Sequence, residues 1–185
     1  MKYLAAPLLL GALAASLLIL NAANAEDDDD RPRTADVIAV TNPVYEKECG
    51  SCHMAYSPGL LPARSWTAMM SKLNDHFGDN AELDNATQTA ILSYLTMNSA
   101  DHSGYRRSQK IMRSLDSSLN GMATPLRISE LPYIKRKHHE LRPNVFKTHP
   151  DLTSLSQCSA CHSQAAKGSF SEREINIPGM GRWED

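Results

Sequence analysis

A five-residue pattern, Cys-x-x-Cys-His, occurs twice in this chain of 185 residues and accounts for all four of its cysteines. The pattern is the attachment site of a c-type haem: both thiols bind the haem covalently, and the histidine is placed to bind the iron. Each large apolar porphyrin needs a pocket around it. The sequence therefore predicts two covalently bound haem c groups, attached through Cys49, Cys52, Cys158 and Cys161, with His53 and His162 as proximal iron ligands.

Four cysteines could also form a zinc site or disulfide bridges. A zinc site needs both cysteine pairs to converge on one tetrahedral ion, and disulfides are common in exported proteins. Neither arrangement gives a reason for a histidine directly after each pair. Two haems are therefore the favoured interpretation.

Residues 1–25 have the composition of a secretory signal peptide. Lys2 precedes an apolar run over residues 8–20, and Ala23-Asn24-Ala25 is a small-residue cleavage site. We expect cleavage after Ala25 and a mature protein in the periplasm, peripheral to the membrane at most. The alternative is an uncleaved membrane anchor, because the apolar run is not far short of spanning length.

Residues 26–43 are expected to form an acidic, flexible leader. Asp27–Asp30 place four like charges in a row, and such runs repel themselves and are usually solvated. A metal-binding role for these aspartates is the weaker alternative.

Residues 44–100 are predicted to form a helical haem module. Asn42 and Pro43 are a typical helix start, and the first haem pattern would lie at the end of that helix. Apolar residues recur at three- and four-residue steps over residues 64–77, which predicts a second helix. Asp84 can cap a third.

Residues 101–185 are predicted to form a less regular second haem module. A helix is expected around residues 106–115, followed by a loop-like stretch with prolines over residues 125–150. A short helix over residues 156–166 would carry the second haem pattern. The expected fold class is therefore mostly α, a small helical haem module followed by a loop-rich second one.

Charge is unevenly distributed in a chain whose net charge is −2. Residues 101–150 carry ten basic and four acidic residues, a net charge of +6, whereas residues 44–100 carry three basic and six acidic residues, a net charge of −3. Export argues against a nucleic-acid partner. We instead expect Arg106, Arg107, Lys135 and Lys137 to guide docking of an acidic redox protein.

The sixth iron ligand distinguishes an electron carrier from a haem enzyme or a gas or redox sensor, because catalysis and gas binding need an open position. For the first haem, His76 is favoured because it lies at the edge of the apolar stripe of its predicted helix; Met97 is the main rival. For the second haem, His138 or His139 is favoured, and His149 is the next alternative. His102, between polar residues, is expected at the surface.

Several segments besides the haem patterns resemble the bacterial dihaem cytochrome c family, often abbreviated DHC. The similar segments are Pro58-Gly59-Leu60-Leu61-Pro62, His76-Phe77-Gly78, Arg127-Ile128-Ser129-Glu130, Arg136-Lys137-His138 and Ile175-Asn176-Ile177-Pro178-Gly179. The resemblance covers essentially the whole mature chain after the acidic leader.

This resemblance implies an exported electron-transfer protein with two low-spin haems, each held by two histidines. It implies a cytochrome c-like N-terminal part and a less regular C-terminal part. Carried onto this sequence, the distal ligands are His76 and His138. The implied redox partners are an oxygen-binding monohaem cytochrome of the SHP type and a membrane cytochrome b.

Overall fold

The computed structural model describes residues 35–118, 124–141, 145–148 and 152–183. Contacts among residues 33–185 group them into one compact unit. The predicted signal peptide, the Asp27–Asp30 run and His149 lie outside the described residues. The division into two haem modules after residue 100 stays a prediction.

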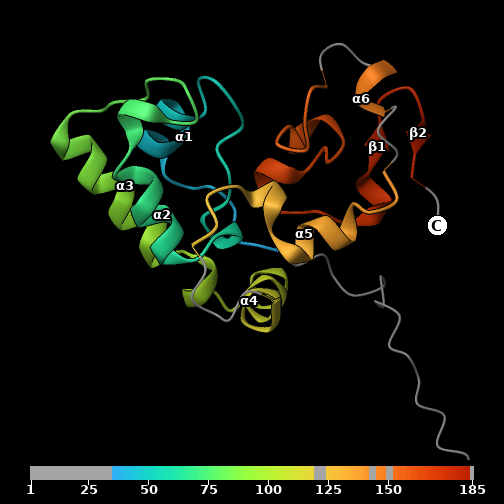
Figure 1. The fold of residues 1–185 in the computed structure, drawn as a ribbon, viewed down its shortest axis with the longest axis horizontal. Helices are drawn as coiled ribbons and strands as arrows, with labels where there is room; N and C mark the ends of the chain where they lie inside the picture. The colour runs from blue at the N-terminus through green and yellow to red at the C-terminus, as the bar shows by residue number, and fades with distance from the viewer. Residues whose placement is uncertain (1–34, 119–123, 142–144, 149–151, 184–185) are drawn as a thin grey trace, which may run out of the picture. The chain divides into compact units, whose positions relative to one another are not determined.

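The described part of the chain is mostly α-helical, as predicted (Figure 1). It also holds one short antiparallel ribbon, in which β1 (Asn176–Ile177) pairs with β2 (Gly181–Arg182). None of the described helices is both long and apolar enough to cross a membrane. The helices are α1 (Pro43–Cys49), α2 (Ala63–Met70), α3 (Asn85–Met97), α4 (Arg106–Ser118), α5 (Pro132–Lys137) and α6 (Val145–Thr148).

Two predicted helix starts are confirmed by their caps. At α1, the Asn42 side chain accepts a hydrogen bond of 2.9 Å from the Tyr45 N–H, and Pro43 occupies the first turn. At α3, Asp84 accepts bonds from the N–H groups of Ala86 and Thr87, both 3.0 Å. These bonds satisfy donors that have no partner inside the helix.

The helix predicted over residues 64–77 is shorter than expected. It ends at Met70, and a separate 3₁₀ turn covers Leu73–Asp75. The Leu73 carbonyl then accepts a bond of 2.8 Å from Ala81 N, and His76 pairs with Asp79 in an isolated bridge. Backbone groups of Leu73 and His76 thus form their hydrogen bonds with residues 79–81 and not within a helix. His76 therefore lies in a loop.

The larger hydrophobic cluster extends from the start of the described chain to α5. Its fully buried members include Leu61, Ile91, Ile111 and Leu131. α4, predicted from the sequence, packs closely on the 58–60 turn, where the Ser108 hydroxyl donates a 2.8 Å bond to the Gly59 carbonyl. A Cβ on Gly59 would stand 2.8 Å from that hydroxyl, so a larger residue there would force Ser108 to move.

The second haem pattern and the preceding segment differ from prediction. Residues 132–137, expected to be a loop, form α5, because proline is well accommodated in the first turn of a helix. The helix expected over residues 156–166 is replaced by two 3₁₀ turns, Cys158–Ala160 and Ala165–Lys167. A small second cluster of Val145, Leu152 and Ile177 packs in this part of the chain.

The flexible leader predicted for residues 26–43 is wrong for residues 35–42. Val37 is fully buried in the larger cluster. The N–H groups of Asp36 and Val37 both donate to the Gly168 carbonyl, at 2.9 and 3.1 Å. Gly168 has a positive φ of 79°, and a Cβ there would collide with the Val37 carbonyl. This segment is therefore part of the folded unit.

Replacing Val37 with alanine should destabilise the holoprotein by about 2 kcal/mol, because two buried methyl groups are lost and a cavity remains. Val44→Ala is the matched control: its side chain is 44% exposed, so its effect should stay within about 0.5 kcal/mol. Urea unfolding followed by circular dichroism measures both. Equal free energies of unfolding for the two variants would contradict the packed position of Val37.

Candidate functional site

The structure brings His53 and His76 together as the first facing pair of imidazoles. Their ring centroids lie 6.2 Å apart and their planes differ by 25°. His53 follows α1 and the first cysteine pair, and His76 is held by backbone bonds with Asp79 of 2.7 and 3.3 Å. Two segments more than twenty residues apart therefore present their rings to each other.

Hydrogen bonding prepares His53 to bind a metal. Its Nδ1 lies 2.8 Å from the Met54 carbonyl. A carbonyl can only accept, so Nδ1 is the donor, and in the neutral ring Nε2 is the nitrogen with a lone pair for a metal. At His76, burial and then the neighbouring His53 lower the pKa, which favours the neutral ring that a metal requires.

His138 and His162 form the second facing pair. Their centroids lie 6.0 Å apart and their planes are nearly perpendicular, at 76°. His138 caps α5 and its Nδ1 lies 2.8 Å from the Ile134 carbonyl, so Nδ1 is the donor and Nε2 is the metal-binding nitrogen of the neutral ring. Burial, then His138 and Arg107, lower the pKa of His162 to about 4, so its ring is neutral at physiological pH.

Backbone pairing and ring packing hold His162 in place. His162 forms an isolated bridge with Ile175, and Asn176 N donates a 2.9 Å bond to the Cys161 carbonyl. Its ring packs edge-on against Phe170, with centroids 5.2 Å apart. Its buried Nδ1 has no hydrogen-bond partner among the described residues.

The spacing of both pairs fits a metal held between two imidazoles. An imidazole nitrogen binds a transition metal at about 2.0 Å, and about 1.1 Å separates that nitrogen from the ring centre, so two axial rings have centres about 6.2 Å apart. The observed separations are 6.2 and 6.0 Å. Each pair has a haem-attachment pattern beside it, so the residues fit a haem at both places.

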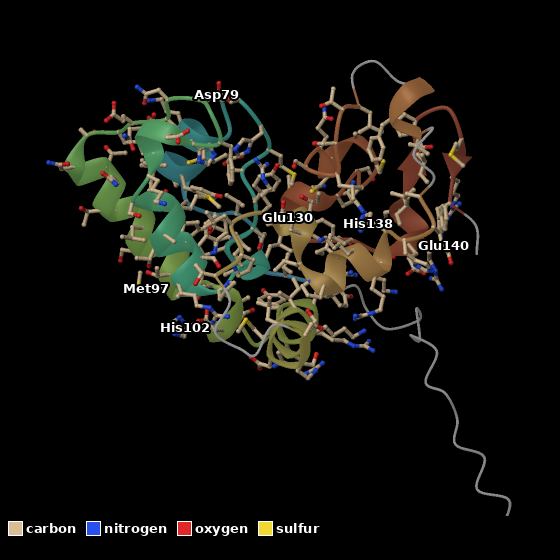
Figure 2. The ribbon with its side chains drawn as sticks, viewed as in Figure 1. Asp79, Met97, His102, Glu130, His138 and Glu140 are labelled. Atoms are coloured by element: carbon tan, nitrogen blue, oxygen red, sulfur yellow. The ribbon has the colours of Figure 1, made fainter. Side chains whose placement is uncertain are left out.

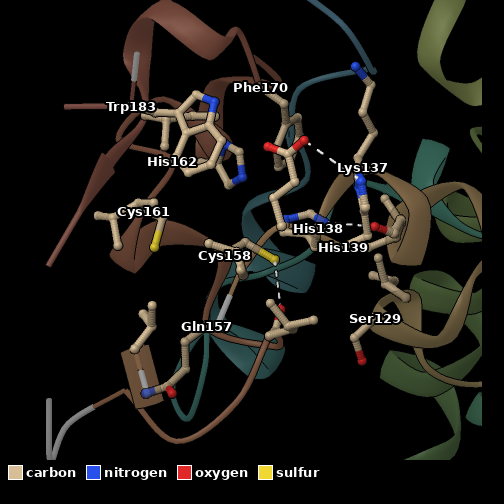
Figure 3. Close-up of a pocket in the computed structure, with 18 of the residues that line it drawn as sticks. Ser129, Lys137, His138, His139, Gln157, Cys158, Cys161, His162, Phe170 and Trp183 are labelled. Carbon is tan, nitrogen blue, oxygen red and sulfur yellow. Dashed lines mark hydrogen bonds and ion pairs between the residues drawn. The ribbon is translucent and has the colours of Figure 1, made fainter. Parts of the chain in front are cut away.

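A cavity surrounds the second pair (Figure 3). His138 and His162 line it together with both cysteines of the second pattern. Arg107, Arg136 and Lys137 also line it and supply positive charge for a haem's carboxylates. Its apolar lining suits a porphyrin and comprises Leu60, Ile128, Ile134, Leu141, Val145, Phe146, Leu152, Leu155, Phe170, Ile175, Ile177 and Trp183.

The cysteines do not support a disulfide or a zinc site. All four lie within the described residues and none forms a disulfide. Across the described ranges, no three His, Cys, Asp or Glu side chains gather in a way that could hold a metal ion. Burial raises the pKa of the Cys49 and Cys158 thiols to about 11, which agrees with sulfurs that face the interior rather than solvent.

A model of the dihaem cytochrome c family matches residues 45–170. The chain belongs to the dihaem cytochrome c family. It therefore carries two covalently bound haem c groups, and its family is one of haem-based electron carriers. No curated protein matches the chain.

Solved structures support this assignment. A diheme cytochrome c from Rhodobacter sphaeroides is 47% identical, with a TM-score of 0.62 over 72% of this chain and 100% of that one. The diheme cytochrome type c from Shewanella baltica OS155 is 39% identical, with a TM-score of 0.62 over 77% of this chain and 98% of that one. A second structure, of DHC purified from Rhodobacter sphaeroides, is 46% identical, with a TM-score of 0.57.

Sequence reasoning missed how Asp36 contributes to the second haem pocket. Asp36 pairs with Arg107 at 3.2 Å and also accepts a 2.7 Å bond from Phe170 N. Arg107 in turn donates to the Tyr133 hydroxyl and the Phe170 carbonyl, at 3.2 and 3.3 Å. Asp36 thus holds Phe170 against His162. Nothing in the local sequence marks it, because it directly follows an acidic, polar stretch.

Among the described residues, the remaining histidines and Met97 make no ring contact with His53 or His162. Met97 is 67% exposed, and His102 is exposed and bonded to the Thr96 carbonyl at 2.8 Å (Figure 2). His139 also lines the second cavity, but its side chain is 69% exposed and lies 3.7 Å from the Glu140 carboxylate. His149 lies outside the described residues. The geometry therefore favours His76 and His138.

Proposed function

We propose that this protein is a periplasmic carrier of single electrons, not an enzyme, and that both of its haems are six-coordinate with two histidine ligands. His53 and His76 would hold the first iron, and His162 and His138 the second. The observation that supports this is the pair of ring separations, 6.2 and 6.0 Å, each matching two imidazoles on one metal.

In this function the protein binds the two haems and keeps small molecules away from their irons. The bound haem supplies one-electron exchange between ferric and ferrous iron. With both pairs of histidines binding iron, the chain would leave no coordination position for dioxygen, peroxide or another small substrate. The carbonyls of Met54 and Ile134 orient the rings of His53 and His138.

The proposal is tested by optical and EPR spectra of both oxidation states, with and without carbon monoxide. Both ferric haems should be low-spin, and neither ferrous haem should bind carbon monoxide. The near-parallel rings at the first site and near-perpendicular rings at the second should give an ordinary rhombic signal and a highly anisotropic one. A high-spin haem that binds carbon monoxide would indicate an enzyme or sensor site instead.

His76→Met and His138→Met should each raise one midpoint potential by on the order of 100 mV, because methionine ligation stabilises ferrous haem relative to histidine. Haem attachment should persist, since the cysteines are untouched. His102→Met and His139→Met are matched controls at exposed histidines and should leave both potentials unchanged. Spectroelectrochemical titration measures all four variants, and unchanged potentials in His76→Met would remove His76 as a ligand.

We also propose an acidic redox protein as the physiological partner, docking beside the second haem. Lys135, Arg136 and Lys137 are exposed, and Arg136 and Lys137 line the second haem cavity. Complementary charge speeds such encounters. By resemblance, a monohaem cytochrome of the SHP type and a membrane cytochrome b are the proteins to test.

Electron transfer to such a partner should slow as salt is raised, because screening shortens from about 10 Å at 0.1 M to about 3 Å at 1 M. Lys135→Glu should slow the reaction at low salt. Lys47→Glu is the matched control, at a side chain 82% exposed on α1. Stopped-flow kinetics measure the rates, and salt-independent rates would point to an apolar docking face.

A further inference from the structure

Tyr56 connects the two haem-attachment patterns, although they are more than a hundred residues apart in the sequence. Its ring stacks on the ring of His53, with centroids 4.8 Å apart and planes at 23°. Its hydroxyl donates a hydrogen bond of 2.7 Å to the carbonyl of Ser156. One side chain therefore contacts the proximal ligand of the first haem and the segment that carries the second.

The Ser156 carbonyl is also next to the second haem's attachment point. The sulfur of Cys158 lies 3.6 Å from this same oxygen. Ser156 and Cys158 are also joined through a single intervening residue. The path from Tyr56 to the Cys158 sulfur, which binds the second haem, therefore consists of one hydrogen bond and the backbone from Ser156 to Cys158.

The backbone around Tyr56 is held firmly. Its own carbonyl accepts a 2.8 Å bond from the hydroxyl of Tyr45, whose side chain is only 2% exposed within α1. The next residue, Ser57, donates a 2.6 Å bond to the Ile38 carbonyl. The ring of Tyr56 is therefore presented to His53 from a fixed point of the fold.

A second contact shows that the two sites adjoin on the distal side as well. The Arg127 guanidinium lies 4.0 Å from the ring centroid of Phe77, the neighbour of His76. The next residues, Ile128 and Ser129, line the second haem cavity. This route reaches neither an iron ligand nor an attachment atom of the second haem, so the Tyr56 route is the more direct of the two.

We propose that Tyr56 is the bridging residue through which the two haems exchange electrons. The inference rests on the proposed function, since it needs two redox-active irons. In each exchange one iron goes from ferrous to ferric while the other goes from ferric to ferrous. Tyr56 is not itself oxidised. Its ring stack and hydrogen bond give electrons a continuous path between the two sites. Without them, electrons would have to tunnel through a gap, where the rate decays more steeply with distance.

Pulse radiolysis of the intact holoprotein tests the proposal. A substoichiometric pulse of reductant should be followed by a redistribution phase whose rate does not depend on protein concentration. Tyr56→Phe keeps the stack and loses the bond to Ser156, so this phase should slow severalfold. Tyr56→Leu, which loses both, should slow it further. Tyr94→Phe is the matched control: it also loses a hydroxyl contact, that with Thr41 N at 3.1 Å, but touches neither haem ligand pair.

The outcomes separate this proposal from its rivals. If Tyr56 is only a structural tether, Tyr56→Phe should lower the unfolding midpoint and leave the redistribution rate unchanged, which overturns the proposal. A wild-type protein with no concentration-independent phase overturns it as well. EPR spectra of the same samples test the proposed function separately. Two low-spin signals, with unchanged redistribution rates in the Tyr56 variants, would support the electron-carrier function and overturn the bridging role of Tyr56.

Discussion

The proposed function requires an imidazole on both faces of each haem, and the fold must meet that requirement at two places. His53 and His162 directly follow an attachment cysteine in the sequence, whereas the rings that face them come from separate segments. Each segment must be placed so that ring centres stand about 6 Å apart. In this chain one facing ring comes from a loop bridged to Asp79 and the other from the end of α5.

The two facing rings are held by different means. α5 begins at Pro132 and runs for six residues, after which His138 bonds back to the Ile134 carbonyl. Its last turn is basic, which complements the partial negative charge at the C-terminal end of a helix. His76 has only the short 3₁₀ turn Leu73–Asp75 before it. Backbone bonds to Asp79 and the bond from Ala81 to Leu73 hold its loop.

The segment with Asp36 and Val37 connects the larger hydrophobic cluster to the second haem pocket. Val37 belongs to the larger hydrophobic cluster, while Asp36 pairs with Arg107 and binds the backbone of Phe170. Phe170 then packs against His162. The order of the second haem pocket thus depends on residues more than 120 positions earlier, and Tyr56 makes a comparable long-range connection to Ser156.

The sequence by itself determined the cofactor: two Cys-x-x-Cys-His patterns identify the thiols that attach two haems and predict the adjacent histidines as proximal ligands, because both depend only on local order. It also predicted α1 and α3 from their caps and α4 from the spacing of its apolar residues, because these features are local. Only the tertiary structure decided which of His138 and His139 faces His162, that His76 lies in a loop, and that residues 35–42 are packed. These outcomes depend on bonds between distant segments, such as Ala81 with Leu73 and Asp36 with Arg107, which no periodicity in the chain encodes.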